Sequence, residues 1–314
     1  MRLGVIGAGR WGKRYIETIA RVDGVDLAHL GSTNPQSVAL IPKACRLSSD
    51  WRAVTTDRGL DGIIVATPPA THLEIALAAI HSGIPVLVEK PMTLSLDDAA
   101  TLARVASAQR VLVMVDHTHL FSPAFRALRE RAAGLGPVLG VRSAGANHGP
   151  VRPDTPVLWD WGPHDISMSV ALFGELPHTV EARRSGTHAM DGGIGEAIEI
   201  MLEFTNGRRS EIRVSNIESR KRRWLEARYA EATLVYDDLA SDKLTLRRKR
   251  SGDAQAIPID GATSLTTVVR EFCQGINAGN RSDPSLPLGY QVVEILAHCQ
   301  ARLDDPRMPT VACH

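Results

Sequence analysis

Three glycines near the N-terminus constrain the fold of this chain more than any other feature of its sequence. Gly7, Gly9 and Gly12 form a G-x-G-x-x-G pattern directly after an apolar run and at the start of a helical pattern. In such a loop the first glycine permits a tight turn, the second lets the backbone approach a pyrophosphate, and the third lets helix and strand pack closely. The helix N-terminus adds unpaired N–H groups and a positive dipole end. The pattern predicts a dinucleotide-binding βαβ unit; the alternative is a glycine turn that binds nothing.

The rest of the first 116 residues supports the same unit. Short β-branched runs alternate with helical patterns, which is typical of parallel βαβ units. Gly83 stands where a left-handed residue would end one helix, and Ser95 with Asp98 forms a capping box for the next. We therefore predict an α/β protein whose residues 1–117 form a Rossmann domain with a doubly wound parallel sheet.

The pattern changes after residue 117. A helix is predicted to open at Ser122 and Pro123, and longer strand-like stretches follow. The pair Asn206-Gly207 between alternating apolar residues predicts a β-hairpin. Further helices are expected around residues 164–174 and from about 289 to 303. Residues 118–314 are therefore predicted to form a second, α+β domain with an antiparallel or mixed sheet.

Composition limits the kind of partner. The 314 residues include 36 basic and 35 acidic side chains, a net charge of +1, and only 4% are aromatic. This balance disfavours nucleic acid or a membrane surface as partner and favours a small ligand. The basic runs 220–223 and 247–250 are predicted to be solvated faces or turns.

The four cysteines are scattered, with no C-x-x-C pair and no neighbouring histidine at metal-ligand spacing. We therefore expect no metal and a reducing, cytoplasmic location. The first apolar run is too short for a signal peptide, and no stretch approaches eighteen uninterrupted apolar residues.

The end of the second predicted strand bears on the choice of cofactor. NAD enzymes usually place an Asp or Glu about twenty residues beyond the glycine loop, on the ribose hydroxyls. Here no acidic residue occurs between Asp26 and Asp50. The missing carboxylate favours NADP over NAD as cofactor. The preference is slight, because hydroxyl groups also serve the plain ribose of NAD. The side chains that can accommodate a 2′-phosphate are Ser32, Thr33, Arg10 and Lys43.

Three further stretches carry a resemblance. They are VATPPATHLEIALAAIHSGIPVLVEKP, which ends in Glu89-Lys90-Pro91, DHTHLFSPAFRALRERAAGLGPVLGV and VLWDWGPHDISM. Together with the glycine loop they resemble the glucose-fructose oxidoreductase, inositol dehydrogenase and MocA (Gfo/Idh/MocA) family over most of residues 3–175. The resemblance implies a Rossmann domain followed by a domain with an open, largely antiparallel sheet, a homodimer or homotetramer, and a cis peptide before Pro91.

The resemblance also implies catalytic roles for Lys90, Asp160 and His164. Oxidation of a carbinol needs a base, and the pKa of histidine lies near neutrality, so His164 is that candidate. A protonated Lys90 can stabilise developing alkoxide charge, and Asp160, one helical turn earlier, can orient the imidazole or bind a substrate hydroxyl. Many members carry another Asp three residues past the histidine, whereas this chain has Ser167 there and Asp165 beside the histidine.

The remaining candidate residues follow from the same family resemblance. His72 matches a position on the nicotinamide side, although capping of the following helix explains it equally well. His119 and Arg152 are expected to be structural or solvated, and Trp159 and Trp161 to pack. The predicted substrate-binding residues are Lys90, His117, Asn147, Asp160 and His164. The predicted cofactor-binding residues are Gly7, Gly9, Arg10, Trp11, Gly12, Ser32, Thr33, Thr67, Pro68, Pro69, His72, Glu89 and Lys90.

These residues predict an NAD(P)-dependent oxidoreductase that transfers hydride between nicotinamide and a secondary hydroxyl or ketone of a sugar, polyol or nucleotide sugar. Two alternatives remain open. One is a non-catalytic, dinucleotide-dependent sensor, and the other is an imine or enone reductase on the same scaffold.

Overall fold

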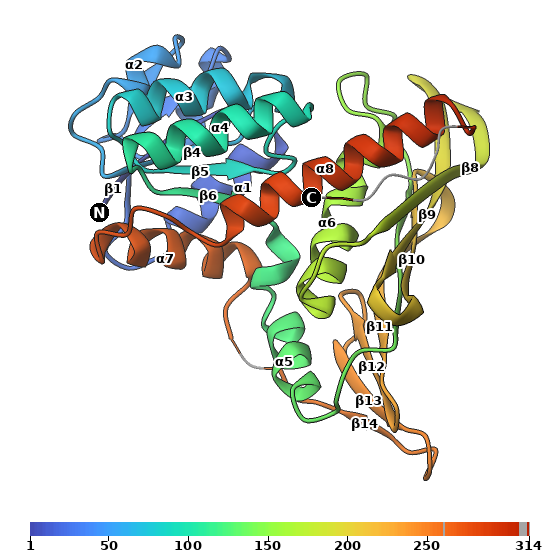
Figure 1. Ribbon diagram of the computed structural model, residues 1–314. Coiled ribbons are helices and arrows are strands. Elements are labelled where there is room, and N and C mark those ends of the chain that lie inside the picture. Colours follow the sequence, from blue (N-terminus) through green and yellow to red (C-terminus); the bar gives the residue numbers. More distant parts are fainter. Residues whose placement is uncertain (260, 308–312, 314) are drawn as a thin grey trace. The chain divides into compact units, whose positions relative to one another are not determined.

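The computed structural model describes residues 1–259, 261–307 and 313, which form two compact units (Figure 1). The first unit is Met1–Thr118 together with Thr263–Val293, and the second is His119–Ala262 together with the chain from Glu294 onward. Two segments far apart in the sequence therefore build each unit. The division near residue 117 that the sequence suggests stays a prediction about independent domains.

A six-stranded parallel sheet forms the centre of the first unit, in the order β3-β2-β1-β4-β5-β6. The order reverses between β1 and β4, and in open α/β sheets ligands bind outside the carboxyl ends of the strands at such a switch point. This confirms the predicted doubly wound sheet. The strands are β1 (Arg2–Ile6), β2 (Asp26–Gly31), β3 (Arg46–Ser48), β4 (Gly62–Val65), β5 (Val86–Glu89) and β6 (Val113–Asp116).

Helices cover this sheet, and strands such as β4 and β5 are buried along their whole length. Strands that are covered on both faces have continuously apolar rather than alternating sequences. The run Gly62–Val65 of β4 follows this pattern. In Figure 1, α3 and α4 lie together on one side of the strands, and α7 lies on the other. The helices are α1 (Arg10–Ile19), α2 (Arg52–Thr55), α3 (His72–His81), α4 (Leu96–Gln109), α7 (Ser264–Asn277) and the first part of α8 (Ser285–Asp304).

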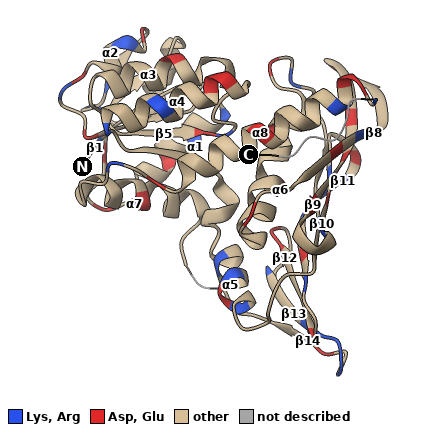
Figure 2. Cartoon of the chain, viewed as in Figure 1, with Lys and Arg blue, Asp and Glu red and all other residues tan. Residues whose placement is uncertain are grey.

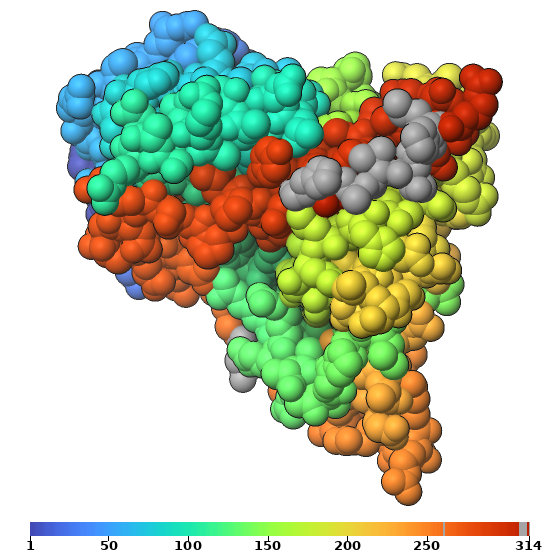
Figure 3. Space-filling model, viewed as in Figure 1, coloured from blue at the N-terminus to red at the C-terminus, as the bar shows by residue number. Residues whose placement is uncertain are grey.

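Local signals in the sequence account for the ends of these helices. Gly83, just after α3, has a left-handed φ of 74°, and the Ser95 side chain accepts a hydrogen bond from the Asp98 N–H at the start of α4. The left-handed residue after α3 and the Ser95 cap of α4 are therefore confirmed. On α4 the buried residues recur at Ala99, Leu102 and Ala106, while the outer side of the helix lies at the molecular surface in Figure 3.

The second unit contains an eight-stranded sheet in the order β14-β13-β12-β11-β7-β10-β9-β8. Only β7 and β10 pair in parallel among these described strands, so the prediction of a largely antiparallel sheet is confirmed. The strands are β7 (Gly140–His148), β8 (Thr179–Met190), β9 (Gly193–Phe204), β10 (Arg208–Ser215), β11 (Ile217–Arg228), β12 (Ala232–Asp237), β13 (Leu244–Arg248) and β14 (Ala254–Ala256).

The hairpin between β9 and β10 turns at Asn206 and Gly207, both with left-handed φ angles of 61° and 68°. Asparagine and glycine adopt this conformation at little steric cost, which confirms the predicted turn. Along β8 to β11 both signs of charge are visible in Figure 2.

Helix α6 (Val157–Phe173) packs against β7, β9 and β10, while α5 (Pro123–Ala132) packs on β12 and β13. The helix predicted around residues 164–174 therefore begins seven residues earlier than expected. Gly162 and Pro163 lie inside α6. Proline normally breaks a helix interior because it lacks an N–H and clashes with the preceding turn, so local sequence argues against this extension. The early start of α6 places Asp160 and His164 on one helix.

No helix in the described part of the chain is both long and apolar enough to cross a bilayer.

The contact between the glycine loop and α1 leads to a stability prediction. A Cβ atom built on Gly12 would lie 1.9 Å from the carbonyl oxygen of Gly7, whereas one on Gly9 would meet no described atom within 4 Å beyond its chain neighbours. We expect Gly12→Ala to lower the free energy of unfolding by about 1–3 kcal/mol, the usual cost of overpacking. The matched Gly9→Ala should change it by less than about 0.5 kcal/mol. Urea unfolding of both variants measures the difference, and equal stabilities would contradict this account of the packing.

Candidate functional site

The glycine loop joins β1 to α1 with the geometry that a pyrophosphate requires. Gly7 has a φ of 101°, and a Cβ there would approach the Ala66 carbonyl oxygen to 2.6 Å. Gly9 is the N-cap residue of α1, and no side chain of the described residues caps that end. The first N–H groups of α1 are therefore available to a phosphate, and the open space at Gly9 lets it approach.

The chain after β2 presents hydroxyl groups in place of a carboxylate. Ser32 Oγ lies 2.9 Å from Ser37 Oγ and accepts a hydrogen bond from the Asn34 N–H at 3.2 Å. Thr33 is exposed. Sequence reasoning missed Ser37; the signal was the short helical turn that begins after Asn34, whose side chain caps it.

His72 holds two loops together. The side chain is fully buried, with Nδ1 3.0 Å from the Pro91 carbonyl oxygen and Nε2 2.9 Å from that of Thr67. Burial lowers the pKa of His72. The residue makes no side-chain cap for α3, so the capping alternative is wrong. Next to it, Thr71 donates to the Thr67 hydroxyl at 2.7 Å and fixes the turn that contains Pro68 and Pro69.

A buried acidic network lies at the carboxyl ends of β5 and β6. Glu89 and Asp116 are in register on these neighbouring strands and are 4% and 0% exposed. The hydroxyl of Tyr15, from α1, donates to Asp116, and the Thr118 hydroxyl donates to the same carboxylate at 2.9 Å. The N–H of Lys90 donates to Glu89 at 3.2 Å. Two carboxylates, a phenol and a lysine thus surround one point of the first unit.

The environment shifts the protonation of this network. Burial first and the neighbouring Asp116 second raise the pKa of Glu89, whereas Lys90 opposes that shift. Burial likewise raises the pKa of Asp116, and burial with both carboxylates raises that of Tyr15. The charge of Asp116 therefore disfavours ionisation of Glu89, because like charges repel in a buried site. Sequence reasoning missed Tyr15 and Asp116 because no local pattern links α1 to the end of β6.

His117 is the strongest candidate for contact with a ligand in this unit. Burial, with the charge of Lys90, lowers its pKa to about 3, so the imidazole is neutral. Both ring nitrogens are buried and have no hydrogen-bond partner among the described residues. Buried polar atoms are nearly always paired, so such an unpaired imidazole points to a bound group.

In the second unit, α6 presents Asp160 and His164 four residues apart on one face. His164 is 7% exposed, and its ring packs edge-on against that of His119 with centroids 4.8 Å apart. His119 Nδ1 lies 3.1 Å from the Tyr236 hydroxyl. The expectation that His119 is structural or solvated stays a prediction, and the contact with Tyr236 was not anticipated.

Asp160 has a cationic neighbour. Arg152 Nη1 lies 3.6 Å from Asp160 Oδ1, and a cavity of about 160 Å³ beside them is also lined by Trp161 and Asn216. Asn147 donates to the Gly149 carbonyl oxygen at 3.4 Å. Arg152 was expected to be structural or solvated, and that role stays a prediction beside its pairing with Asp160.

A second buried carboxylate, Asp165, lies near a stacked arginine. Burial raises the pKa of Asp165 to about 6, and Ser143 and Arg223 oppose the shift. The Arg223 guanidinium lies 4.1 Å from the centroid of the Trp161 ring. Arg223 belongs to the basic run 220–223, so the prediction of a wholly solvated run is wrong for this residue.

The other tryptophan packs as expected. Trp159 is 6% exposed, and its indole N–H donates to the Gln300 side chain at 3.2 Å.

Comparison with known proteins agrees with this architecture. Residues 1–117 match the model of an oxidoreductase family with an NAD-binding Rossmann fold, and residues 131–235 match the Gfo/Idh/MocA C-terminal domain. The chain belongs to the Gfo/Idh/MocA family of oxidoreductases. This confirms the family resemblance predicted from the sequence.

Relatives within the family differ in the substrate that their names give. Inositol 2-dehydrogenase 2 of Saccharopolyspora erythraea is 31% identical over 224 residues, 66% of this chain and 64% of that enzyme, so the match spans less than two thirds of its length. UDP-N-acetylglucosamine 3-dehydrogenase of Acidithiobacillus ferrooxidans is 26% identical over 82% of this chain and 80% of its own. A crystal structure from Magnetospirillum magnetotacticum MS-1 superposes with a TM-score of 0.89 at 43% identity, covering 95% of this chain and 99% of that one.

The cis peptide implied by the family resemblance is present between Lys90 and Pro91.

The acidic network predicts a dependence of stability on pH. Because the folded-state pKa of Glu89 is raised above its usual 4.5, ionisation is harder in the folded chain than in the unfolded one. The contribution of Glu89 to stability is complete below about pH 4.5 and declines as the pH rises through the folded-state value. We expect Glu89→Gln to lose less stability between pH 5 and pH 8 than the parent protein in urea unfolding. The exposed Glu130→Gln is the control, and parallel curves for all three proteins would contradict the buried network.

Proposed function

We propose that this protein is an NAD(P)-dependent dehydrogenase that transfers hydride between nicotinamide and a secondary hydroxyl or ketone of a sugar, polyol or nucleotide sugar. Family membership and the names of relatives that act on inositol and UDP-N-acetylglucosamine support this class of substrate. The observation that carries the proposal is the pair Lys90 and His164, two side chains of complementary chemistry that are each 7% exposed. The proposal requires both to reach one substrate.

The first unit fits a dinucleotide. The uncapped N-terminus of α1 and the space at Gly9 would hold the pyrophosphate, and Ser32 with Ser37 would face the adenosine ribose. The other predicted cofactor residues, from Arg10 and Trp11 to the turn at Thr67, stay a prediction. When bound, the nicotinamide supplies or accepts the hydride.

The protein's own groups would manage the proton. In the direction of oxidation, the His164 imidazole takes the proton of the substrate hydroxyl while hydride leaves the carbon that bears this hydroxyl. In reduction the imidazole returns the proton to the oxygen. The Lys90 ammonium donates a hydrogen bond to the reacting oxygen and stabilises its negative charge. Asp160, on the same face of α6, orients the imidazole or binds a neighbouring hydroxyl, with its own charge balanced by Arg152.

The unpaired imidazole of His117 supports a role in ligand binding. A neutral imidazole can donate from one nitrogen and accept at the other, which suits a substrate hydroxyl. We also retain Asn147 as a predicted substrate contact. The sensor alternative is disfavoured because both Lys90 and His164 are retained, whereas an imine or enone reductase is separated from a dehydrogenase only by assays with substrates.

Association of copies is proposed on one observation. The face of the large sheet formed by β7 to β11 is hollowed over about 910 Å³ and lined by arginines and glutamates, including Arg142, Glu211 and Arg213. An open, self-complementary charged face suits a two-fold dimer. A homodimer or homotetramer, and a cytoplasmic location, remain predictions from the sequence.

The chemical step is tested by two substitutions. We expect His164→Ala to lower turnover by about 10²–10⁴, as loss of a positioned base does, and Lys90→Met by about 10²–10³, as loss of a donor to the developing oxyanion does. Turnover is followed by nicotinamide absorbance, with a panel of myo-inositol, sugars and UDP-N-acetylglucosamine. Cofactor affinity, measured by calorimetry, should stay within a few fold, and the exposed His188→Gln serves as control. Near-parental turnover in both variants would show that the site is wrongly assigned.

Cofactor preference is tested at the end of β2. We predict measurable use of NADP, because no carboxylate stands at Ser32 or Thr33 to repel a 2′-phosphate. Ser32→Asp should shift the ratio of kcat/KM values toward NAD. Gly9→Val is the companion variant: it should stay folded and lose affinity for both cofactors. A parent protein that strongly prefers NAD would overturn the argument at Ser32.

A further inference from the structure

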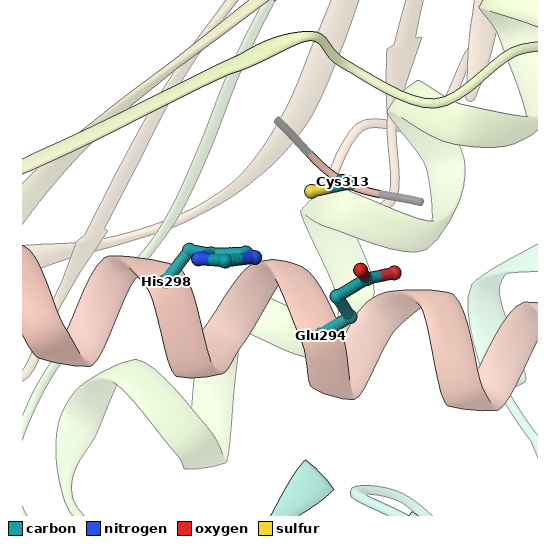
Figure 4. Close-up of side chains that lie close together, drawn as sticks. All are labelled: Glu294, His298 and Cys313. Atoms are coloured by element: carbon teal, nitrogen blue, oxygen red, sulfur yellow. The ribbon is translucent and has the colours of Figure 1, made fainter. Parts of the chain in front are cut away.

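A cluster of three different metal-ligating side chains lies in the second unit, and none of the three is assigned to hydride transfer. Glu294 and His298 are four residues apart on α8 and therefore share one face of the helix. Cys313 adds a thiol, and one carboxylate oxygen, one imidazole nitrogen and the sulfur all lie within 4.8 Å of one another. Figure 4 shows the carboxylate and the imidazole on the same side of α8, with Cys313 on that side as well.

The surroundings of the cluster favour a cation. Glu294 is 4% exposed, so its carboxylate is removed from water. The buried carboxylate attracts a divalent ion strongly at low dielectric, and the imidazole and the sulfur beside it offer two further ligand atoms. His298 and Cys313 are partly exposed, which leaves an approach for the ion.

We propose that Glu294, His298 and Cys313 bind a zinc ion, with water as a fourth ligand. Thiolate, imidazole and carboxylate are the three ligand types that Zn²⁺ takes in tetrahedral sites, whereas Mg²⁺ and Ca²⁺ take oxygen. With metal–ligand distances of about 2.0–2.3 Å, tetrahedral ligand atoms lie about 3.5 Å apart, so the cluster must close by roughly 1 Å.

Binding would proceed with release of a proton. The Cys313 thiol loses its proton to solvent as sulfur bonds to Zn²⁺, while the imidazole and the carboxylate bind through existing lone pairs. No redox change or further reactant is involved. Because the ligands join residue 313 to α8, the ion would stabilise the second unit, and the effect does not depend on the proposed dehydrogenase activity.

The spacing of the three residues in the sequence does not predict a metal site. A Glu and a His four residues apart are ordinary on a helix, and the cysteine follows fifteen residues after the histidine. The expectation of no metal was based on the absence of compact cysteine and histidine motifs. Here the fold, rather than the sequence, brings the ligands together.

The test uses the full chain freed of metal by a chelator. Calorimetric titration with Zn²⁺ should give one site, and Co²⁺ should give the charge-transfer absorption of a thiolate ligand. Zn²⁺ should also raise the melting temperature. We expect Glu294→Gln, His298→Gln and Cys313→Ser each to weaken Zn²⁺ binding at least about tenfold and to remove the thermal shift, as the loss of one of three ligands should.

The controls are Glu130→Gln, His188→Gln and Cys45→Ser, each of the same chemistry outside the cluster, and they should bind Zn²⁺ as the parent does. Circular dichroism of the metal-free variants establishes that they fold. Should Glu294→Gln fail to fold, the variants of the two partly exposed residues decide. Absence of Zn²⁺ binding, or binding that none of the three substitutions changes, would overturn the proposal, since the second result means only adventitious surface binding.

Discussion

The close packing of α1 against the end of β1 is the contact on which the first unit depends. Gly12 lies so near the Gly7 carbonyl oxygen that no side chain fits between them. This approach fixes the N-terminus of α1 over the glycine loop. It also sets the direction of the same helix three residues later, where Tyr15 reaches Asp116 at the end of β6. One backbone contact thus positions both the predicted phosphate site and the buried acidic network.

That network explains how a lysine can be kept near two carboxyl groups in a buried place. Glu89 and Asp116 end neighbouring parallel strands and are register partners, so their side chains lie on the same face of the sheet. Fully ionised, the pair would be costly to bury, because two like charges at low dielectric repel strongly. The Tyr15 hydroxyl, the Thr118 hydroxyl and the Lys90 N–H reduce that cost by donating to the carboxylates. At the carboxyl ends of β5 and β6, hydrogen-bond donors therefore offset the cost of burying the two carboxyl groups.

Sequence reasoning identified what local patterns encode. The glycine loop, the Ser95 cap and the Asn206-Gly207 turn each need only neighbours in the chain, and all were predicted. Contacts between distant segments were not: α7 returns to the first sheet from residues 264–277, and His119 meets Tyr236 over more than a hundred residues. The early start of α6 was missed for the opposite reason, because Gly162-Pro163 is a strong local signal against a helix that tertiary packing overrides.

The departure from the family pattern at residue 167 has a physical counterpart in α6. The Ser167 hydroxyl is fully buried and donates to the His164 carbonyl oxygen at 2.9 Å, so it is used inside the helix. An aspartate there would place a second charge in the same buried turn. The carboxylate that this chain does carry, Asp165, lies near Gly145, where a Cβ would stand 3.1 Å from its Oδ2 and 3.6 Å from the Arg223 guanidinium. The negative charge is thereby placed against an arginine of β11, and Asp160 is left as the carboxylate that shares a face of α6 with His164.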